Sequence, residues 1–116
     1  MSERDRANLL AMLDAITQIL SYTQSARDPD QFNENRLVFD ATLMNFVVLG
    51  EMASRLSEGL RISTPHIQWV DIRAFRNLIA HEYLGIDAEE VWQIVQDDIP
   101  ALQRDLQKSL NSDSAS

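Results

Sequence analysis

Apolar residues recur every three or four positions along most of this chain, which is the spacing of an amphipathic α-helix. The steps from Leu9 to Leu20 predict a first helix over residues 4–24. The same period from Leu37 to Leu56 predicts a long second helix, for which Gly59 is the expected stop. Only three glycines and three prolines occur in 116 residues, and no alternating pattern is long enough to indicate a sheet.

Two further helices follow a loop around residues 61–68. Pro65 lies near the expected start of the third helix, which ends around residues 83–84, where Gly85 breaks it. Asp87 is the expected cap of a fourth helix that keeps its period to residue 110, with a kink at Pro100. These four helices with short connections predict an all-α chain, an antiparallel four-helix bundle with a kinked last helix. We expect one domain over residues 1–110, a disordered tail over 111–116, and a close helix crossing at Gly50.

Charge and cysteine content narrow the function classes. The formal net charge is −8, which disfavours a general nucleic-acid coat protein. Residues 36–81 nevertheless carry five basic and four acidic groups, a net of +1, so a local phosphate site is compatible with the sequence. The chain has no cysteine, which excludes disulfides and thiolate metal sites. Its charged start lacks a signal-peptide pattern and its apolar runs are too short to cross a bilayer, so we expect a cytoplasmic protein with no membrane partner.

The third helix carries an unusual group of polar side chains in FRNLIAHEYLG, residues 75–85. On a helical wheel of about 100° per residue, Arg73, Arg76, Asn77 and His81 fall within one arc of about 140°. Arginine offers a planar donor fork for phosphate, and an imidazole can transfer protons near neutral pH. The arc therefore indicates either a catalytic cluster or an ordinary polar helix face, and Tyr83 would in the second case be a boundary aromatic. The sequence has no HExxH motif and no glycine-rich phosphate loop, so we expect neither a metal nor a cofactor.

Longer stretches of the sequence resemble one known family. RNLIAHEY fits R-x4-H-x-Y, the signature of the HEPN superfamily, and its surroundings resemble the HepT branch of that superfamily. VVLGEMASRLS is similar to the GEA-type stretch on the family's second helix. PHIQWVDIRAFRNLIAHEYLGID and VWQIVQDDIPALQRDL resemble the blocks that follow in the family. The resemblance covers most of residues 32–106.

The resemblance implies a function and a role for each motif residue. HepT-like proteins are ribonuclease toxins that cleave RNA without metal at a homodimer cleft, and their antitoxin is an MntA-like nucleotidyltransferase. Carried over, the catalytic residues are Arg76, His81 and Asn77, Arg73 is a candidate phosphate contact, and the antitoxin adenylylates Tyr83. Two alternatives stay open: a catalytically silent HEPN bundle that binds the nucleotidyltransferase or a nucleotide, and a purely structural dimerisation bundle.

Overall fold

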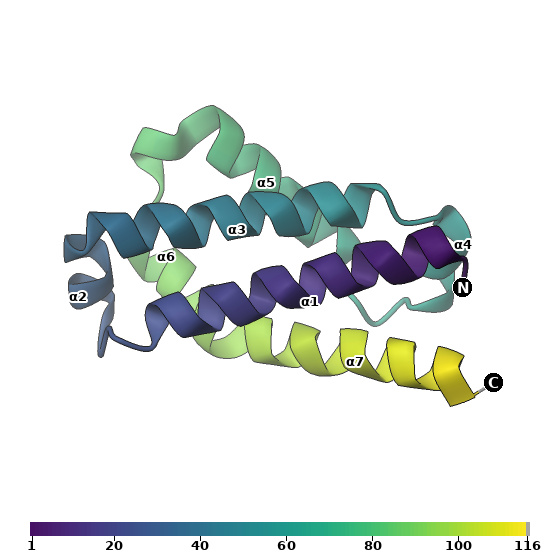
Figure 1. Cartoon of the computed structure of the whole chain (residues 1–116). Coiled ribbons are helices and arrows are strands. Elements are labelled where there is room, and N and C mark those ends of the chain that lie inside the picture. The colour runs from purple at the N-terminus through teal and green to yellow at the C-terminus, as the bar shows by residue number, and fades with distance from the viewer. Residues whose placement is uncertain (116) are drawn as a thin grey trace.

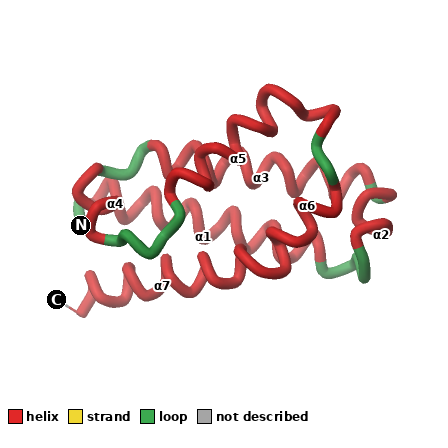
Figure 2. Tube along the Cα trace, turned by 180° about the vertical axis from the view of Figure 1, so that it is seen from behind, coloured by secondary structure: helices red, strands yellow, loops and turns green. Residues whose placement is uncertain are grey.

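The computed structural model describes residues 1–115 of the chain as an all-helical bundle. Three long helices are α1 (Glu3–Thr23), α3 (Arg36–Ser54) and α5 (Trp69–Glu82), and the fourth arm runs without a break through α6 (Ala88–Gln93), the π-helical turn η2 (Ile94–Asp98) and α7 (Ile99–Ala115). Short helices α2 (Pro29–Glu34), α4 (Glu58–Ser63) and η1 (Tyr83–Gly85) connect them. No strand occurs within the described residues (Figure 2). The predicted fold class is confirmed.

Helix α3 lies at the centre of the bundle. It packs against α1 on one side and against α5 on the other, and α7 lies along α1. Successive long helices run in opposite directions (Figure 1). The second half of α5 rises away from the other helices and returns to α6 through η1, so this part of the chain is held mainly by α3 (Figure 1).

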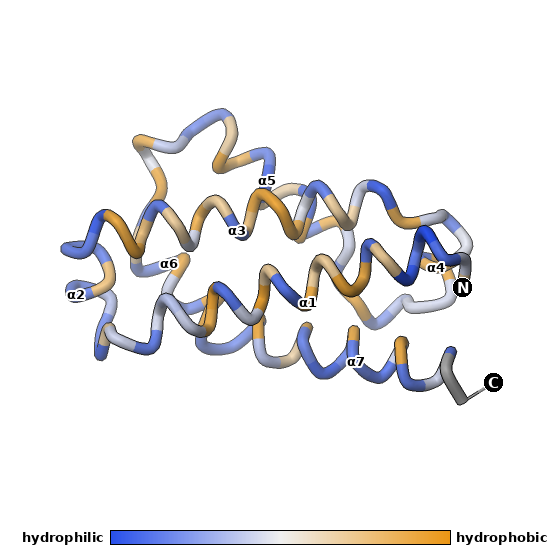
Figure 3. The backbone as a smooth tube through the Cα atoms, viewed as in Figure 1, coloured by the Kyte–Doolittle hydropathy of each residue, from blue (hydrophilic) through white to orange (hydrophobic). Residues whose placement is uncertain are grey.

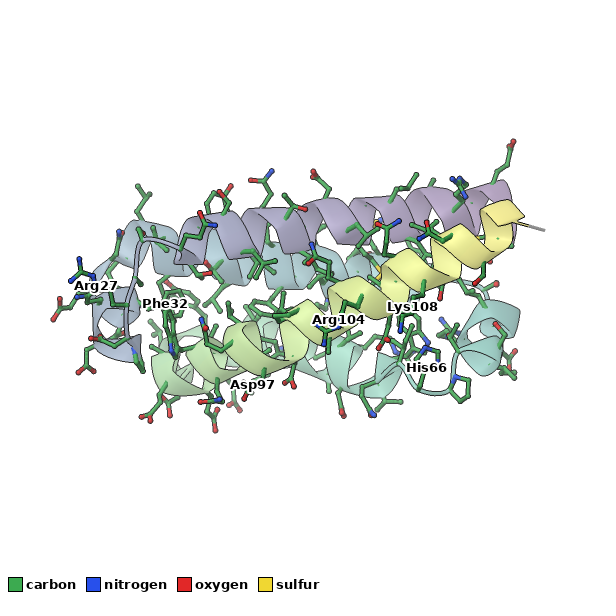
Figure 4. All side chains as sticks on the ribbon, turned by 90° about the horizontal axis from the view of Figure 1, so that it is seen from below. Arg27, Phe32, His66, Asp97, Arg104 and Lys108 are labelled. Atoms are coloured by element: carbon green, nitrogen blue, oxygen red, sulfur yellow. The ribbon has the colours of Figure 1, made fainter. Side chains whose placement is uncertain are left out.

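The core forms where the apolar stripes of these helices meet. Hydrophobic positions recur at helical intervals along α1 and α7 between hydrophilic ones (Figure 3). Phe32 of α2 joins two arms at one end, because its ring lies 5.3 Å from that of Phe39 and 5.8 Å from that of Trp92 (Figure 4). The largest fully buried side chains lie on α1, α2, α3, α6, η2 and α7 and include Leu9, Met12, Ile16, Phe32, Phe39, Leu43, Val91, Val95 and Leu106.

Some boundaries differ from the sequence-based expectation. Helix α3 ends at Ser54 instead of Gly59, because Ser57 begins a new helix by accepting a hydrogen bond from the Leu60 backbone N–H. Helix α5 starts four residues after Pro65, at Trp69. The Trp69 indole donates to the hydroxyl of Thr64 over 3.0 Å, so the turn between these residues is part of the buried structure and not of the helix.

The predicted kink at Pro100 takes the form of the π-helical turn η2. The backbone N–H of Ile99 donates to the carbonyl of Ile94, five residues earlier. Proline has no N–H and its ring collides with the carbonyl four residues before it. A π-helical turn changes the local register of the hydrogen bonds just before Pro100 and lets the helix continue.

The tail over residues 111–116, for which the sequence predicts disorder, continues α7 in the structure as far as Ala115. Asp113 accepts a 2.8 Å hydrogen bond from the amino terminus of Met1, and Arg6 lies 3.8 Å from its second oxygen. These contacts between the two ends of the chain give the last turns of α7 a partner that local sequence does not reveal. The final part of the tail prediction, Ser116, lies outside the described residues.

The expectation that no segment crosses a membrane was based on uninterrupted apolar runs and stays a prediction. By length and composition alone, α3 is long and apolar enough to span a bilayer. A core helix of a soluble protein passes the same test, and 39% of this segment is buried inside the bundle.

A close crossing of α3 and α5 is located at Gly50, as the sequence predicted. A Cβ atom built at Gly50 would lie 2.2 Å from the Cβ and 2.7 Å from the Cγ of Arg76, and 3.3 Å from the carbonyl oxygen of Ile72. Real Cβ atoms do not approach other atoms so closely. Only a residue without a side chain therefore allows α5 to lie at this distance from α3.

Replacing Gly50 with alanine should force the two helices apart. We expect Gly50→Ala to lower the free energy of unfolding by about 1–3 kcal/mol, since overpacking a tight contact costs this much. Gly59→Ala is the matched control, because a Cβ at Gly59 meets nothing within 4 Å and should stabilise α4 by up to about 1 kcal/mol. Urea unfolding followed by circular dichroism measures both; equal effects of the two variants would contradict the crossing.

Asp5 ties the start of α1 to the start of α4. Its side chain is buried, and its two oxygens accept hydrogen bonds from the Ser57 backbone N–H at 2.9 Å and the Ser57 hydroxyl at 2.6 Å. Burial by itself raises the pKa of Asp5, but the hydrogen bonds from Ser57 outweigh it and hold the pKa below its ordinary value of 3.8.

A carboxyl group with a lowered pKa in the folded state stabilises the protein above its unfolded pKa, and this contribution is lost as the pH falls toward the folded pKa. We therefore expect Asp5→Asn to unfold at lower urea concentration than the parent at pH 7. The difference between the urea midpoints of the two proteins should become smaller as the pH is lowered below about 4. The control is Asp14→Asn, which changes an exposed carboxylate on the same helix and should unfold at the same urea concentration as the parent.

Candidate active site

The polar arc predicted on the third helix lies on α5, away from its apolar face. Ile72, Phe75 and Ile79 pack toward the core, where the ring of Phe75 meets that of Phe46 edge-on at 5.0 Å. This packing fixes the rotation of α5 about its own axis. Asn77 and His81 are thereby exposed, while Arg76 lies at the edge of the arc beside α3 and is half-buried.

Arg76 is held at the point where α5 crosses α3. Its Nη2 atom donates to Oε2 of Glu51 at 3.0 Å, and its Nη1 atom donates to Oδ1 of Asn77 at 2.9 Å. Glu51 also accepts from Arg55 at 3.4 Å, so one carboxylate lies between two guanidinium groups. The Arg76 side chain is half-buried, and these two bonds fix the direction in which its guanidinium points.

Glu51 is a site residue that the sequence reasoning did not single out. It directly follows Gly50 in the VVLGEMASRLS stretch, so the glycine and the carboxylate form one unit. Gly50 permits the close approach of the Arg76 side chain at its Cβ and Cγ atoms, and Glu51 then binds the guanidinium of the same residue. A charged residue next to a glycine on an apolar helix was the available signal.

His81 lies one helical turn beyond Asn77, and its side chain is exposed. Within residues 1–115 its side chain makes no hydrogen bond and no ion pair, and it lies on the same arc as Arg76. Of the three predicted catalytic residues, Arg76 and Asn77 are thus hydrogen-bonded to each other, and the His81 side chain is accessible to solvent.

Arg73 completes the arc as a half-buried cation. Its Nε atom is buried and has no hydrogen-bond partner among the described residues, and the same holds for Nε of Arg76. Buried donors without a partner are uncommon in folded proteins and invite an explanation. Two guanidinium groups on the same arc as an open imidazole can bind an anion such as a phosphate and exchange protons with it.

Tyr83 lies at the other end of the motif, at the start of η1, and is bonded to α3. Its hydroxyl donates a short hydrogen bond to Oδ1 of Asp40. This bond raises the pKa of the Tyr83 hydroxyl above its ordinary value; desolvation acts in the same direction, and the nearby Arg36 guanidinium opposes both. Tyr83 is 39% exposed, so its ring remains accessible.

Asp40 and Arg36 were also missed by the sequence reasoning. Asp40 and Glu51 are eleven residues apart, about three helical turns, so they share one face of α3. Helix α5 lies on that face. Asp40 accepts a hydrogen bond from Tyr83 and Glu51 accepts one from Arg76, so the two carboxylates bind the two ends of the motif. Charges repeated on one face of an otherwise apolar helix could have indicated a polar partner.

An all-α bundle that presents an Arg-Asn-His arc agrees with the comparisons with known proteins. The family model "Ribonuclease HepT-like" matches residues 12–109. The chain therefore belongs to the HepT-like ribonuclease family of the HEPN superfamily.

Several curated relatives are similar over nearly their full length. "Putative RNase MJ1380" of Methanocaldococcus jannaschii is 27% identical over 108 residues, which is 92% of this chain and 98% of the relative. "Putative RNase MJ0125" of the same organism is 27% identical over 109 residues, 93% of each protein. "Probable ribonuclease HepT" of Thermococcus cleftensis is 25% identical over 95 residues, 82% of this chain and 86% of the relative. No solved structure matches the chain significantly.

Removing Asp40 should release the Tyr83 hydroxyl. We expect Asp40→Ala to lower the pKa of Tyr83 toward its ordinary value of 10.0, because the acceptor that stabilises the neutral hydroxyl is gone. The absorbance of tyrosinate in a titration to high pH measures this in a Tyr22→Phe background, which leaves Tyr83 as the one tyrosine. Glu34→Ala, which removes an exposed carboxylate on α2, should leave the titration unchanged. An equal pKa of Tyr83 with and without Asp40 would contradict the hydrogen bond between the two residues.

Proposed function

We propose that this chain is a metal-independent endoribonuclease and the toxin of a type VII-like toxin–antitoxin pair in the cytoplasm. The observation that carries the proposal is the arrangement on α5. A guanidinium oriented by Glu51 and Asn77 lies five residues from an open imidazole on the same arc, in a chain of the HepT-like ribonuclease family. The names of its relatives support RNA as the substrate.

The chemistry requires a base, an acid and a cation at the scissile phosphate. The ribose 2′-hydroxyl attacks phosphorus, a 2′,3′-cyclic phosphate forms, and the 5′-oxygen of the next nucleotide leaves with a proton. His81 exchanges protons with these oxygens, and Arg76 binds the phosphate oxygens and stabilises the charge that develops on them. Asn77 orients Arg76, and Arg73 extends the phosphate contact. Because the 2′-hydroxyl is the nucleophile, DNA is not a substrate.

A homodimer supplies the second proton-transfer group that such a reaction uses. Two copies of the arc facing each other place one His81 on each side of the phosphate and double the number of cations, which offsets the overall acidity of the chain. The exposed apolar side chains beside the arc support an interface there. They are Leu78 and Leu84 on α5 and η1, and Leu37 and Met44 on α3.

The antitoxin in this proposal is an MntA-like nucleotidyltransferase that adenylylates Tyr83. The tyrosine oxygen attacks the α-phosphorus of ATP, the bond to the bridging oxygen breaks, and pyrophosphate leaves. Asp40, already bonded to the hydroxyl, accepts its proton, and Arg36 lies next to the phosphate that is added. The adduct brings bulk and negative charge to within two residues of His81, where the RNA phosphate binds.

The second candidate function is a catalytically silent HEPN bundle that binds the nucleotidyltransferase. It is favoured by the net charge of −8 and by the pairing of Arg76 with Glu51, which already neutralises the central cation. Ribonuclease activity of the isolated chain distinguishes the two.

Purified chain without any partner should cleave total RNA in excess EDTA and leave 2′,3′-cyclic phosphate ends. We expect His81→Ala and Arg76→Ala each to lower the cleavage rate by about 100-fold or more, since each removes a proton-transfer or charge-stabilising group. Both variants should retain the helical circular dichroism spectrum of the parent, because both side chains lie outside the core.

His66→Ala is the matched control, because His66 is the other histidine of the chain, is exposed and lies before α5. It should cleave RNA like the parent. Equal activity of the parent and the His81 variant would overturn the assignment of roles. An inactive parent, with Tyr83 shown to be unmodified by intact mass, would support the silent bundle instead.

A further inference from the structure

A groove lies between α5 and the last helical arm, on the side of α5 away from the polar arc. Its volume is about 300 Å³, at the lower end of the range for ligand pockets. Its lining comes from α3, from α5 and the turn before it, and from η2 and α7. The apolar residues of the lining include Phe46, Leu49, Ile72, Phe75, Ile99 and Leu102.

The groove exists because α5 packs on α3 and its second half departs from the bundle. The first half of α5 and the start of α7 therefore flank a strip of α3 without closing over it. Ile72, Phe75 and Leu102 are only partly buried although they border the core. Removing such apolar surface from water is favourable, so another molecule that covers the groove gains binding energy.

The rim of the groove is acidic. Asp71 comes from α5, and Asp98 and Asp105 come from η2 and α7 on the opposite side. Within the described residues none of these three carboxylates receives a hydrogen bond or an ion pair. His66 is the one basic side chain that lines the groove, and neither a lysine nor an arginine does. Figure 4 views this side of the molecule, with α7 in front and His66 labelled near the chain that leads into α5.

We propose that the groove binds an amphipathic helix of a partner protein, whose apolar face fills the groove and whose lysine and arginine residues pair with Asp71, Asp98 and Asp105. A helix that lies in an apolar groove uses anchors spaced three and four residues apart, and flanking charges complementary to the rim orient it. A second copy of this chain is a poorer occupant, because it carries the same charge of −8 and would bring that charge to an acidic rim.

This surface is separate from the proposed ribonuclease site. On a wheel of about 100° per residue, one arc of α5 holds Asp71, Ile72 and Phe75. The other arc holds Arg73, Arg76, Asn77 and His81. A partner helix in the groove would therefore contact the same helix as RNA without competing for the same side chains. Binding can also be measured without any reference to RNA cleavage.

The test uses a fluorescein-labelled helical peptide of about 15 residues, with leucines at positions i, i+3, i+4 and i+7 and lysines on both flanks. A second peptide has glutamate in place of each lysine. We expect the lysine peptide to bind the parent and the glutamate peptide not to bind. The combined variant Asp71→Asn, Asp98→Asn and Asp105→Asn should weaken binding by about tenfold at low salt.

A matched variant, Asp14→Asn, Glu34→Gln and Glu82→Gln, changes the net charge equally but lies outside the groove and should bind like the parent. Leu102→Lys puts a cation into the groove and should abolish binding, and circular dichroism checks that each variant is folded. Equal binding of both peptides, or an equal loss in the two neutralised variants, would overturn the proposal. So would self-association of the parent that Leu102→Lys removes, because a second copy would then occupy the groove.

Discussion

The contact of α3 with α5 at Gly50 is the constraint on which the rest of the site depends. A side chain at this position would overlap with Arg76, so the absence of a Cβ sets the distance between the two helices. At that distance Glu51, the next residue on α3, reaches the Arg76 guanidinium. One small residue therefore determines both a packing distance and the orientation of the central cation.

Helix α3 fixes the position of the motif, because residues of α3 bind the first and the last residue of the motif, Arg76 and Tyr83. Glu51 binds Arg76 and Asp40 binds Tyr83, while His81 between them has no partner among residues 1–115. This division suits the proposed chemistry. A phosphate-binding cation benefits from a fixed position, and a group that exchanges protons with different oxygens benefits from open access. The Glu51 carboxylate of α3 also lies between the guanidinium groups of Arg55 and Arg76 and reduces their mutual repulsion.

The two arcs of α5 have different chemistry and different proposed partners. The outer arc is cationic and polar, which suits RNA, and the inner arc borders an apolar groove with an acidic rim, which suits a basic helix. Because α5 is anchored mainly on α3, both surfaces remain accessible on one short helix. A single element can in this way carry a catalytic surface and a docking surface without either covering the other.

The helical period of the sequence by itself determined the all-α fold and the four long arms. It also determined that one face of α5 carries Arg73, Arg76, Asn77 and His81. These features depend only on neighbours within a few turns of the same helix. The sequence also indicated the crossing at Gly50 and the disturbance before Pro100. Only the tertiary structure decided that Glu51 and Asp40 contact residues of the candidate site, that Asp113 binds the amino terminus, and that α5 and α7 leave a groove. Each of these depends on contacts between residues far apart in the chain, whose distances and directions the local period does not contain.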